Sequence, residues 1–353
     1  MTLAGGETMN KKSSRSLALQ RAGLIMLCVV LGVLLALMIG GTVYAEHLLS
    51  RLNYVDSAET MPTLSSDEIV AIENETDPVL PGFTAPEIES SDVDFGTGPQ
   101  LEIGGGDIVN ILLIGQDGDS KTGARSDTMI LCTFNKQEDT ITMTSFLRDL
   151  YVKIPGYKSN RINAAYSIGG IPLLNQTLSE NFGVEIDGNV QVDFSRFEEI
   201  IDMLGGVTMD LTRAEANFIN MHVPGSGLTE GEHLLTGYQA LMYARNRNDV
   251  DGDFSRTNRQ RKLLNVLIDE YKNKKLTEML GLLNDILPMV TTDISKADLT
   301  AYAVTLFPML ATAQIRTQSI PVADGYYGAR INGMAVLVPD MEKNIQALVD
   351  SLT

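Results

Sequence analysis

Five arginines crowd into one short stretch of a strongly acidic chain. The protein has 353 residues and a formal net charge of −18, yet residues 236–271 gather guanidinium groups on both sides of a Gly/Asp-rich loop at 248–253. The arginines are Arg245, Arg247, Arg256, Arg259 and Arg261. A guanidinium stays charged and binds phosphate oxygens in pairs. We interpret the cluster as a phosphate-binding site; a solvated basic face paired with acidic side chains is the alternative.

Two helices are expected to present these arginines. Thr236 and Gln239 have the spacing of a capping box, which predicts that one helix begins there and ends near the loop. A second helix is expected from Ser255 to Tyr271, because several side chains recur at helical spacing and would lie along one face: Arg256, Arg259 or Gln260, Leu263, Val266 or Leu267, and Tyr271. Its first turn is basic, where the helix dipole disfavours cations. A phosphate bound at this terminus would reverse that penalty.

Further arginines and paired carboxylates occur earlier in the chain. Asp117 and Asp127 lie near the ends of neighbouring predicted strands and offer the hard oxygen donors that Mg²⁺ prefers when it also holds phosphate oxygens. Asp119 competes with Asp117 for this role, and each carboxylate alone would be a turn residue or an ion-pair partner. The additional candidate phosphate ligands are Arg125, Arg148 and Arg161. Arginines together with paired carboxylates favour a metal-bridged diphosphate as the ligand.

Strands and helices alternate in the part of the chain that carries these residues. Continuous apolar runs predict buried strands at Ile108–Ile114, Thr128–Phe134 and Thr140–Phe146. Further elements are expected as a short helix at 161–166 stopped by Gly169 and Gly170, strands at 191–194, 206–211 and 314–321, helices at 195–204 and from 339, and two helices within 276–310. The pattern predicts a three-layer α/β/α domain with a central mixed sheet. The loop at 115–127 lacks the Gly-Lys-Ser/Thr of a nucleotide-binding P-loop.

The sequence predicts a membrane protein with four parts: a cytoplasmic tail, a membrane anchor, a stalk and a catalytic domain. Residues 22–45 are apolar and uncharged and would form a helix of roughly 36 Å, enough to cross a bilayer. Because the tail at 1–21 is basic and acidic residues follow the run, the N-terminus is expected in the cytoplasm and the remainder outside. The run exceeds the apolar core of a signal peptide, so we interpret it as an uncleaved single-pass anchor. Residues 46–106 read as a flexible acidic stalk, and 107–353 as the catalytic domain.

Other classes of function have little support in the composition. An acidic chain is a poor general binder of nucleic acid, since such binding depends on neutralising phosphates. Cys28 lies in the apolar run and Cys132 in a predicted strand, so a disulfide between them is not expected. The three histidines are scattered and no Cys/His spacing suits zinc.

Five blocks resemble the signature of the LytR-CpsA-Psr family, in the family's order. They are Asn110–Asp117, Arg125–Met129, Ser145–Asp149, Arg161–Tyr166, and Tyr243–Arg247 continuing to Arg259–Gln260. The resemblance implies a membrane-anchored, extracytoplasmic enzyme of bacteria with a Gram-positive type of envelope. Such an enzyme transfers an anionic glycopolymer, for example wall teichoic acid or capsular polysaccharide, from undecaprenyl pyrophosphate to peptidoglycan.

The resemblance also implies roles for single residues. The family's metal-binding carboxylates fall on Asp117 and Asp127, with Mg²⁺ as the expected cofactor. The family's pyrophosphate-binding arginines fall on Arg125, Arg148, Arg245 and Arg247, and a further polar site position falls on Gln260. We add Arg161 and Arg256 as expected pyrophosphate ligands from their residue type and place in the sequence. Arg125 and Asp253 are the catalytic candidates, with Asp253 as the base for the acceptor hydroxyl. Two departures are visible, because Arg161 stands where lysine is frequent and Leu147 where proline is common.

Two other functions suit the same residues. A hydrolase would cleave the same polyprenyl pyrophosphate with water as the acceptor. A non-catalytic surface regulator would bind polyanionic polymers, and its function would survive the loss of Asp127. The lipid tail of a carrier needs an apolar groove, but the many Leu, Ile, Met and Phe side chains of the domain equally form an ordinary core.

Overall fold

The computed structural model describes residues 46–78, 85–99, 101–117, 125–247, 253–272, 276–306 and 308–352. The chain divides into two compact units, Met1–Arg51 and Leu52–Thr353, and the second unit contains the sheet and the arginine cluster. The predicted tail at 1–21 and anchor at 22–45 lie outside the described residues. None of the helices in the described part combines the length and the apolar character needed to cross a bilayer.

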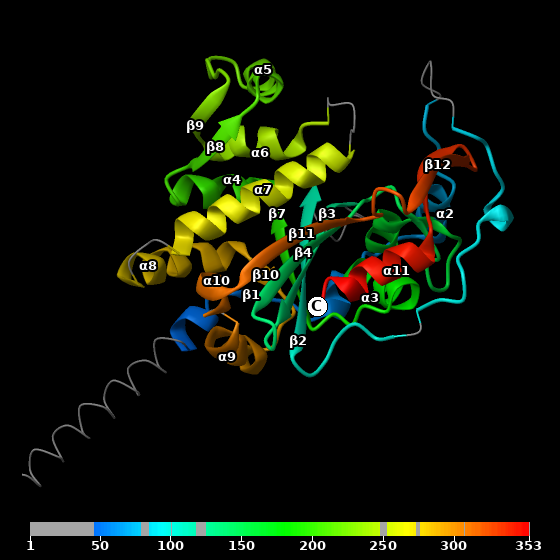
Figure 1. Ribbon diagram of the computed structural model, residues 1–353, viewed down its shortest axis with the longest axis horizontal. Coiled ribbons are helices and arrows are strands. Elements are labelled where there is room, and N and C mark those ends of the chain that lie inside the picture. The colour runs from blue at the N-terminus through cyan, green and yellow to red at the C-terminus, as the bar shows by residue number, and fades with distance from the viewer. Residues whose placement is uncertain are drawn as a thin grey trace, which may run out of the picture. The chain divides into compact units, whose positions relative to one another are not determined.

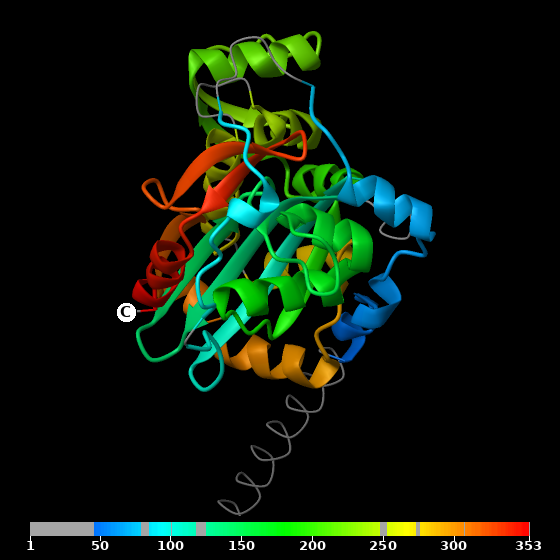
Figure 2. The ribbon, with the colours of Figure 1, turned by 90° about the vertical axis from the view of Figure 1, so that its right-hand side faces the viewer.

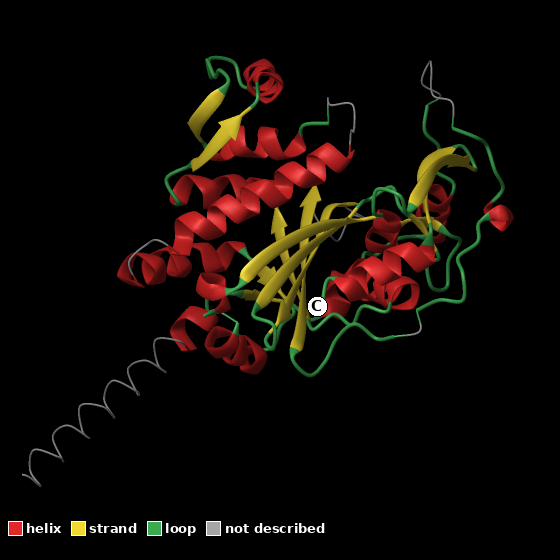
Figure 3. Cartoon of the chain, viewed as in Figure 1, coloured by secondary structure: helices red, strands yellow, loops and turns green. Residues whose placement is uncertain are grey.

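A mixed seven-stranded sheet forms the centre of the unit, with the strand order β1-β10-β7-β2-β3-β4-β11 (Figure 1, Figure 3). Its strands are β1 (Asn53–Tyr54), β2 (Ile108–Asp117), β3 (Arg125–Asn135), β4 (Thr140–Phe146), β7 (Gly188–Asp193), β10 (Thr291–Thr292) and β11 (Gln314–Ile320). The strands β2, β3 and β4 are antiparallel neighbours, whereas β7 runs parallel to β2 and β11 parallel to β4. The predicted mixed sheet is therefore confirmed.

Helices cover both faces of this sheet because successive side chains of each buried strand point to opposite sides. Leu112 and Ile114 of β2 pack in a cluster with α3 (Ile162–Phe182) and α11 (Met341–Asp350), the face turned toward the viewer in Figure 2. Ile111 faces the other way, in a cluster with Leu306 and Met309 beside α9 (Lys296–Thr305) and α10 (Met309–Thr312).

The helices that carry the arginines lie on this second face. They are α6 (Gly237–Arg245) and α7 (Asp253–Lys272), with α4 (Phe194–Met203) beside α6 and with α8 (Leu276–Ile286) after α7. Beyond α6 lie α5 (Arg213–His222) and the hairpin of β8 (Val207–Leu211) and β9 (Gly231–Leu235) (Figure 1). The predicted capping box at the start of α6 is confirmed, since Gln239 N donates to Thr236 Oγ1 and Thr236 N donates to Gln239 Oε1. The predicted start of α7 is two residues late.

The helix predicted to stop at Gly169 and Gly170 does end there, and a second helical segment of α3 follows the glycine pair and runs to Phe182. The glycine pair forms a kink, with non-helical backbone angles at both residues. Gly170 has a φ of +62°, and a Cβ placed there would lie 2.5 Å from the carbonyl oxygen of Thr60. Glycine therefore permits both the left-handed conformation and the close approach of a second chain segment.

The segment expected to be a flexible stalk is largely folded onto the domain. The helix α2 (Ser66–Glu73) packs Ile69 and Ile72 against the main core, and Ile103 is 2% exposed. Val93 is buried with Tyr151 of β5 (Tyr151–Val152) and with the hairpin of β12 (Tyr326–Ile331) and β13 (Met334–Pro339). The stalk prediction is wrong for these described stretches. Isolated apolar side chains anchor a segment whose overall composition is polar, and composition alone does not register them.

Candidate functional site

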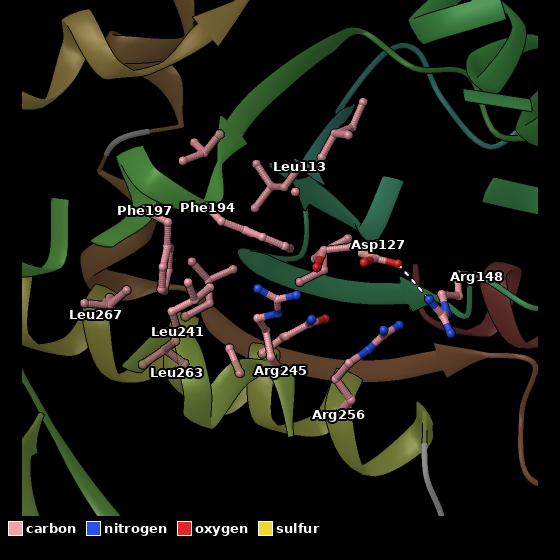
Figure 4. Close-up of a pocket in the computed structure, with 18 of the residues that line it drawn as sticks. Leu113, Asp127, Arg148, Phe194, Phe197, Leu241, Arg245, Arg256, Leu263 and Leu267 are labelled. Carbon is pink, nitrogen blue, oxygen red and sulfur yellow. Dashed lines mark hydrogen bonds and ion pairs between the residues drawn. The ribbon is translucent and has the colours of Figure 1, made fainter. Parts of the chain in front are cut away.

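A cavity of about 600 Å³ separates the sheet from the arginine-bearing helices. Most of its wall is apolar, with Leu113 and Ile130 on the sheet and Phe197, Leu241 and Leu263 on α4, α6 and α7 (Figure 4). Its remaining wall is charged or polar and is formed by Asp127, Arg148, Arg245, Arg247, Arg256 and Gln260. Such a cavity suits a ligand with an apolar body and an anionic head.

A β-bulge places Asp127 in the cavity. Thr128 and Ile130 of β3 both line it, so regular alternation would turn Asp127 to the opposite face of the sheet. The register shifts at this point, because Gly115 pairs with Thr128 whereas Gln116 pairs with Ser126. Asp127 is therefore the additional residue of the bulge, and it lines the cavity together with Thr128. Bulges commonly redirect side chains in this way next to functional sites.

Three arginines from different parts of the chain alternate with two carboxylates at the polar wall. Arg148 Nη1 donates to Asp127 Oδ1 at 2.9 Å, and Arg247 Nη2 lies 3.6 Å from the same oxygen. Arg256 Nη2 donates to Asp253 Oδ2 at 2.9 Å. The other carboxylate oxygen, Asp253 Oδ1, lies 3.7 Å from Arg148 Nε and 3.8 Å from Arg247 Nε. The structure thus brings together residues that the sequence separates by more than 120 positions.

Some nitrogen donors of these arginines have no hydrogen-bond acceptor within the described residues. Only 2% of the Arg256 side chain is exposed, and within the described residues its Nε and Nη1 donate to no acceptor. Burial lowers the pKa of Arg256 to about 10. Gln260 Oε1 is likewise buried and accepts no hydrogen bond from the described residues. Because buried polar groups without partners are costly, these atoms mark where a ligand would bind.

The carboxylate of Asp127 is held in its charged form. Burial alone would raise its pKa, but the charge and hydrogen bond of Arg148 and the charges of Arg256 and Arg247 outweigh this and lower it. The neighbouring Asp149 behaves in the opposite way. Burial raises the pKa of Asp149, and the charge of Asp253 adds to that effect against the lowering effect of Arg148.

Arg245 stands where the apolar and charged walls meet. Its guanidinium carbon lies 4.9 Å from the centroid of the Phe194 ring, which is a cation–π distance. Figure 4 shows Arg245 and Arg256 extending from their helices toward the sheet face that carries Asp127. A ligand whose apolar body filled the cavity would have its anionic head beside both guanidinium groups.

Arg161 does not line the cavity, although the sequence predicts it as a phosphate ligand. Its Nη2 donates to Asp77 Oδ2, and its Nε lies 3.7 Å from Asp149 Oδ1. The same oxygen of Asp149 lies 3.6 Å from Arg148 Nε. Arg161 is therefore a partner of carboxylates behind the site. Sequence reasoning missed this because Asp77 belongs to the segment that it assigned to a flexible stalk.

The predicted metal pair is only partly described. Asp117 and Arg125 are cross-strand partners at the end of the β2–β3 hairpin, and Arg125 precedes Asp127 by two residues. The side chains of Asp117 and Arg125 lie outside the described residues, as does the whole of Asp119. In the described part of the chain no three His, Cys, Asp or Glu side chains converge as a metal site. The carboxylate of Asp127 suits Mg²⁺ chemically. The hairpin brings the main chain of Asp117 to the same end of the sheet.

Two other arginines of the cluster also lie away from the cavity wall. Arg259 Nε donates to Glu215 Oε1 at 2.8 Å, and both side chains are buried. Arg261 is 5% exposed, and its Nη2 donates to Asn258. No role for Glu215 or Asp149 was evident from the sequence. Glu215 shows only the spacing of a helix cap with Thr212, and no sequence signal connects it to Arg259.

Comparisons with known proteins agree with this geometry. Residues 87–351 match the LytR_cpsA_psr family. The regulatory protein MsrR of Staphylococcus aureus is 31% identical over 252 residues, which cover 69% of this chain and 74% of MsrR. TagU of Oceanobacillus iheyensis is named a polyisoprenyl-teichoic acid–peptidoglycan teichoic acid transferase. It is 34% identical over 247 residues, which cover 67% of this chain and 73% of TagU.

Solved structures give the same result. The structure of TagT with bound octaprenyl pyrophosphate lipid has a TM-score of 0.55 and 25% identity, and covers 78% of this chain and 98% of its own. The crystal structure of Bacillus subtilis TagT has a TM-score of 0.57 and 27% identity, with 76% of this chain and 97% of TagT covered. The match spans both the sheet and the arginine-bearing helices, and the chain belongs to the LytR-CpsA-Psr family.

Proposed function

We propose that this protein transfers an anionic glycopolymer, of the wall teichoic acid or capsular polysaccharide type, from a polyprenyl pyrophosphate carrier to peptidoglycan. The observation that carries the proposal is the cavity itself, in which an apolar wall ends at arginines whose buried donors have no acceptor among the described residues. TagU is named as a teichoic acid transferase, and a TagT structure holds octaprenyl pyrophosphate. Both support the same ligand class here.

The two walls divide the ligand between them. The polyprenyl chain lies among apolar side chains such as Phe197, Leu241 and Leu263, where burial away from water stabilises it. The pyrophosphate lies against Arg148, Arg247 and Arg256. Its oxygens accept hydrogen bonds from nitrogens that have no acceptor within the described residues, and charge-assisted bonds of this kind are the strong ones.

The proposed reaction is a phosphoryl transfer. A hydroxyl oxygen of the acceptor sugar attacks the phosphorus that carries the glycan, and the bond from that phosphorus to the bridging oxygen breaks. Polyprenyl phosphate leaves with the bonding electron pair, and the hydroxyl proton passes to a base. The arginines stabilise the charge that develops on the leaving phosphate, which is usually the largest contribution in such transfers.

Asp253 is our proposed base. Its Oδ2 accepts a hydrogen bond from Arg256, while the contacts of its Oδ1 with Arg148 and Arg247 exceed hydrogen-bond length at 3.7 and 3.8 Å. One oxygen is therefore available to the acceptor hydroxyl. Arg125, at the end of the β2–β3 hairpin, is proposed to contact the same phosphates, and its expected role is catalytic.

Mg²⁺ is the proposed cofactor, held by Asp117 and Asp127. When bound, it would supply a further positive charge beside the phosphate oxygens.

Residues 22–45 are proposed as a single-pass anchor with the N-terminus in the cytoplasm and the catalytic domain outside. Protease added to intact protoplasts would then remove the domain and leave a short membrane fragment, whereas full protection of the domain would contradict this topology.

Reconstitution distinguishes transfer from the two alternatives. Purified full-length protein would be incubated with a synthetic polyprenyl-pyrophosphate-linked glycopolymer, Mg²⁺ and peptidoglycan. Transfer yields glycan covalently attached to peptidoglycan and one polyprenyl phosphate for each glycan. A hydrolase releases free glycan phosphate at the same rate without peptidoglycan. A purely regulatory role, suggested by the name of the MsrR relative, gives binding without any product.

A further inference from the structure

We propose that Glu215 is a positioning residue which, through Arg259, sets the distance between the two groups of arginines at the site. The inference rests on the proposed function for its activity readout only, because its binding readout uses a small anion. Glu215 belongs to α5 and Arg259 to α7, and neither lines the cavity.

The pair is buried and uses both oxygens of the carboxylate. Oε1 of Glu215 accepts the 2.8 Å hydrogen bond from Arg259 Nε. Oε2 accepts hydrogen bonds from the main-chain nitrogen and the hydroxyl of Thr212, each at 2.9 Å. The side chains of Glu215 and Arg259 are 10% and 7% exposed. Burial raises the pKa of Glu215, but the hydrogen bonds from Thr212 and Arg259 lower it overall, so the carboxylate is charged.

Arg259 uses a second nitrogen to hold the end of α6. Its Nη1 donates to the carbonyl oxygen of Asn246 at 2.8 Å, in a buried position. Asn246 is the first residue after α6, where the carbonyl groups have no partner within the helix. An arginine that donates to such a carbonyl fixes where the chain leaves the helix.

The held carbonyl lies between two residues of the site. Arg245 is the last residue of α6 and Arg247 follows Asn246 directly, and both line the cavity. Arg256 lies on α7, less than one turn before Arg259. The Glu215–Arg259–Asn246 connection therefore joins the first group, Arg245 and Arg247, to the second, Arg256.

The planar guanidinium fixes this connection in direction as well as distance. Its Nε donates to Glu215 and its Nη1 donates to Asn246, so rotating the guanidinium of Arg259 would break one of the two hydrogen bonds. Arg247 lies 3.6 Å from Asp127 and 3.8 Å from Asp253, so its guanidinium contacts both carboxylates of the polar wall. A small movement of Asn246 would carry Arg247 out of this arrangement, and errors of about 1 Å in a site are costly to rate.

The test separates positioning from fold stability. Glu215→Gln alone leaves Arg259 buried without its counter-charge, so the melting temperature should fall. Glu215→Gln combined with Arg259→Met removes both charges and keeps the cap on Thr212, since glutamine also serves at that position. The double variant should recover most of the melting temperature. Its affinity for inorganic pyrophosphate, measured by calorimetry on the full-length protein, should nevertheless be about 10-fold to 100-fold weaker.

A mutant cycle shows whether the pair acts through Arg247. In an Arg247→Met background, the double change should weaken pyrophosphate affinity by less than about threefold, because Arg247, the positioned arginine that contacts both carboxylates, is already absent. Independent losses that multiply in the combined variant would overturn the proposal, as would wild-type affinity in the double variant. The matched control is Arg213→Met, which removes an exposed ion pair with Glu230 from the same helix and should change neither quantity.

The binding and transfer readouts separate the two proposals. If the wild-type protein transfers no glycan but the double variant still loses affinity for pyrophosphate, the positioning role is supported and the proposed function is contradicted. Arg259→Lys keeps the charge but cannot bind Glu215 and Asn246 through one planar fork. Its affinity for pyrophosphate should therefore stay well below wild type, and full rescue by lysine would contradict the geometric argument.

Discussion

Arg256→Met is the substitution that most sharply separates a ligand site from a structural ion pair. Methionine has a similar length and no charge, so it fills the space while removing three nitrogen donors. In the ligand-free protein one of these nitrogens binds Asp253, and two have no acceptor within the described residues. Asp253 keeps Arg148 and Arg247 at 3.7 and 3.8 Å. Removal of a buried charge partly offsets the loss of this ion pair, so the free energy of unfolding should fall by less than the roughly 3 to 5 kcal/mol that is usual when a buried pair loses one partner.

The substitution should also lower the rate of transfer. Each hydrogen bond from a charged group is worth roughly 1.5 to 3 kcal/mol, and Arg256 has two nitrogens to offer a pyrophosphate. Allowing for incomplete alignment, the loss of transition-state stabilisation is about 2 to 4 kcal/mol, which lowers kcat/KM by about 30-fold to 1,000-fold. Initial rates of glycan transfer and thermal melts of the same preparations measure both quantities.

Arg261→Met is the matched control on the same helix. Arg261 is also buried, it also has two nitrogens without acceptors in the described residues, and burial also lowers its pKa to about 10. It differs in that it does not line the cavity. Arg261→Met should leave kcat/KM within about threefold of wild type, a difference of roughly 0.7 kcal/mol. Equal losses in both variants, or no loss in Arg256→Met, would refute the reasoning.

Four further outcomes are expected. Asp127→Asn should abolish Mg²⁺-dependent transfer while the protein still folds, and undiminished turnover in excess chelator would contradict the metal proposal. Arg245→Lys should lower kcat/KM by roughly 10-fold or more, because lysine keeps the charge but not the planar guanidinium that lies over Phe194. A silent variant would contradict a role for Arg245 in binding the ligand. Ala244→Phe should fill part of the cavity, and it should weaken the binding of long polyprenyl pyrophosphates more than the binding of inorganic pyrophosphate. Equal effects on both ligands would argue against an apolar tail in this cavity. In the folded protein the pKa of Glu215 lies below its ordinary value of 4.5, so its contribution to stability is present above that pH and is lost as the pH falls through the folded pKa. In denaturation series below pH 5, the free energy of unfolding should therefore depend less steeply on pH in Glu215→Gln than in wild type.

The sequence predicts the elements of the fold well where the signal is local. Apolar runs predict β2, β3 and β4, and the capping box at Thr236 predicts the start of α6. The glycine pair at 169 and 170 interrupts the helix as predicted, and a second helical segment follows it. These features depend on residues within a few positions of one another, which is why a single sequence reveals them.

The details of the site depend on contacts that are distant in sequence. The bulge that turns Asp127 into the cavity arises from pairing between two strands. Arg161 is drawn to Asp77, which belongs to a segment with a polar composition. The arginine cluster itself is evident from spacing, but its division into cavity residues and the buried supports Arg259 and Arg261 is not, since that depends on which face of α7 meets α5 and the sheet.

Photocrosslinking of a polyprenyl pyrophosphate would show whether the lipid binds in this cavity. A carrier with a photoreactive group in its first isoprene units would be bound to the full-length protein, irradiated and mapped by mass spectrometry. Crosslinks are predicted on the apolar wall, at residues such as Phe197, Leu241 and Leu263, and they should be lost in Arg256→Met but kept in Arg261→Met. Crosslinks elsewhere, or labelling of the wall that does not depend on Arg256, would contradict the assignment of this cavity to the lipid pyrophosphate.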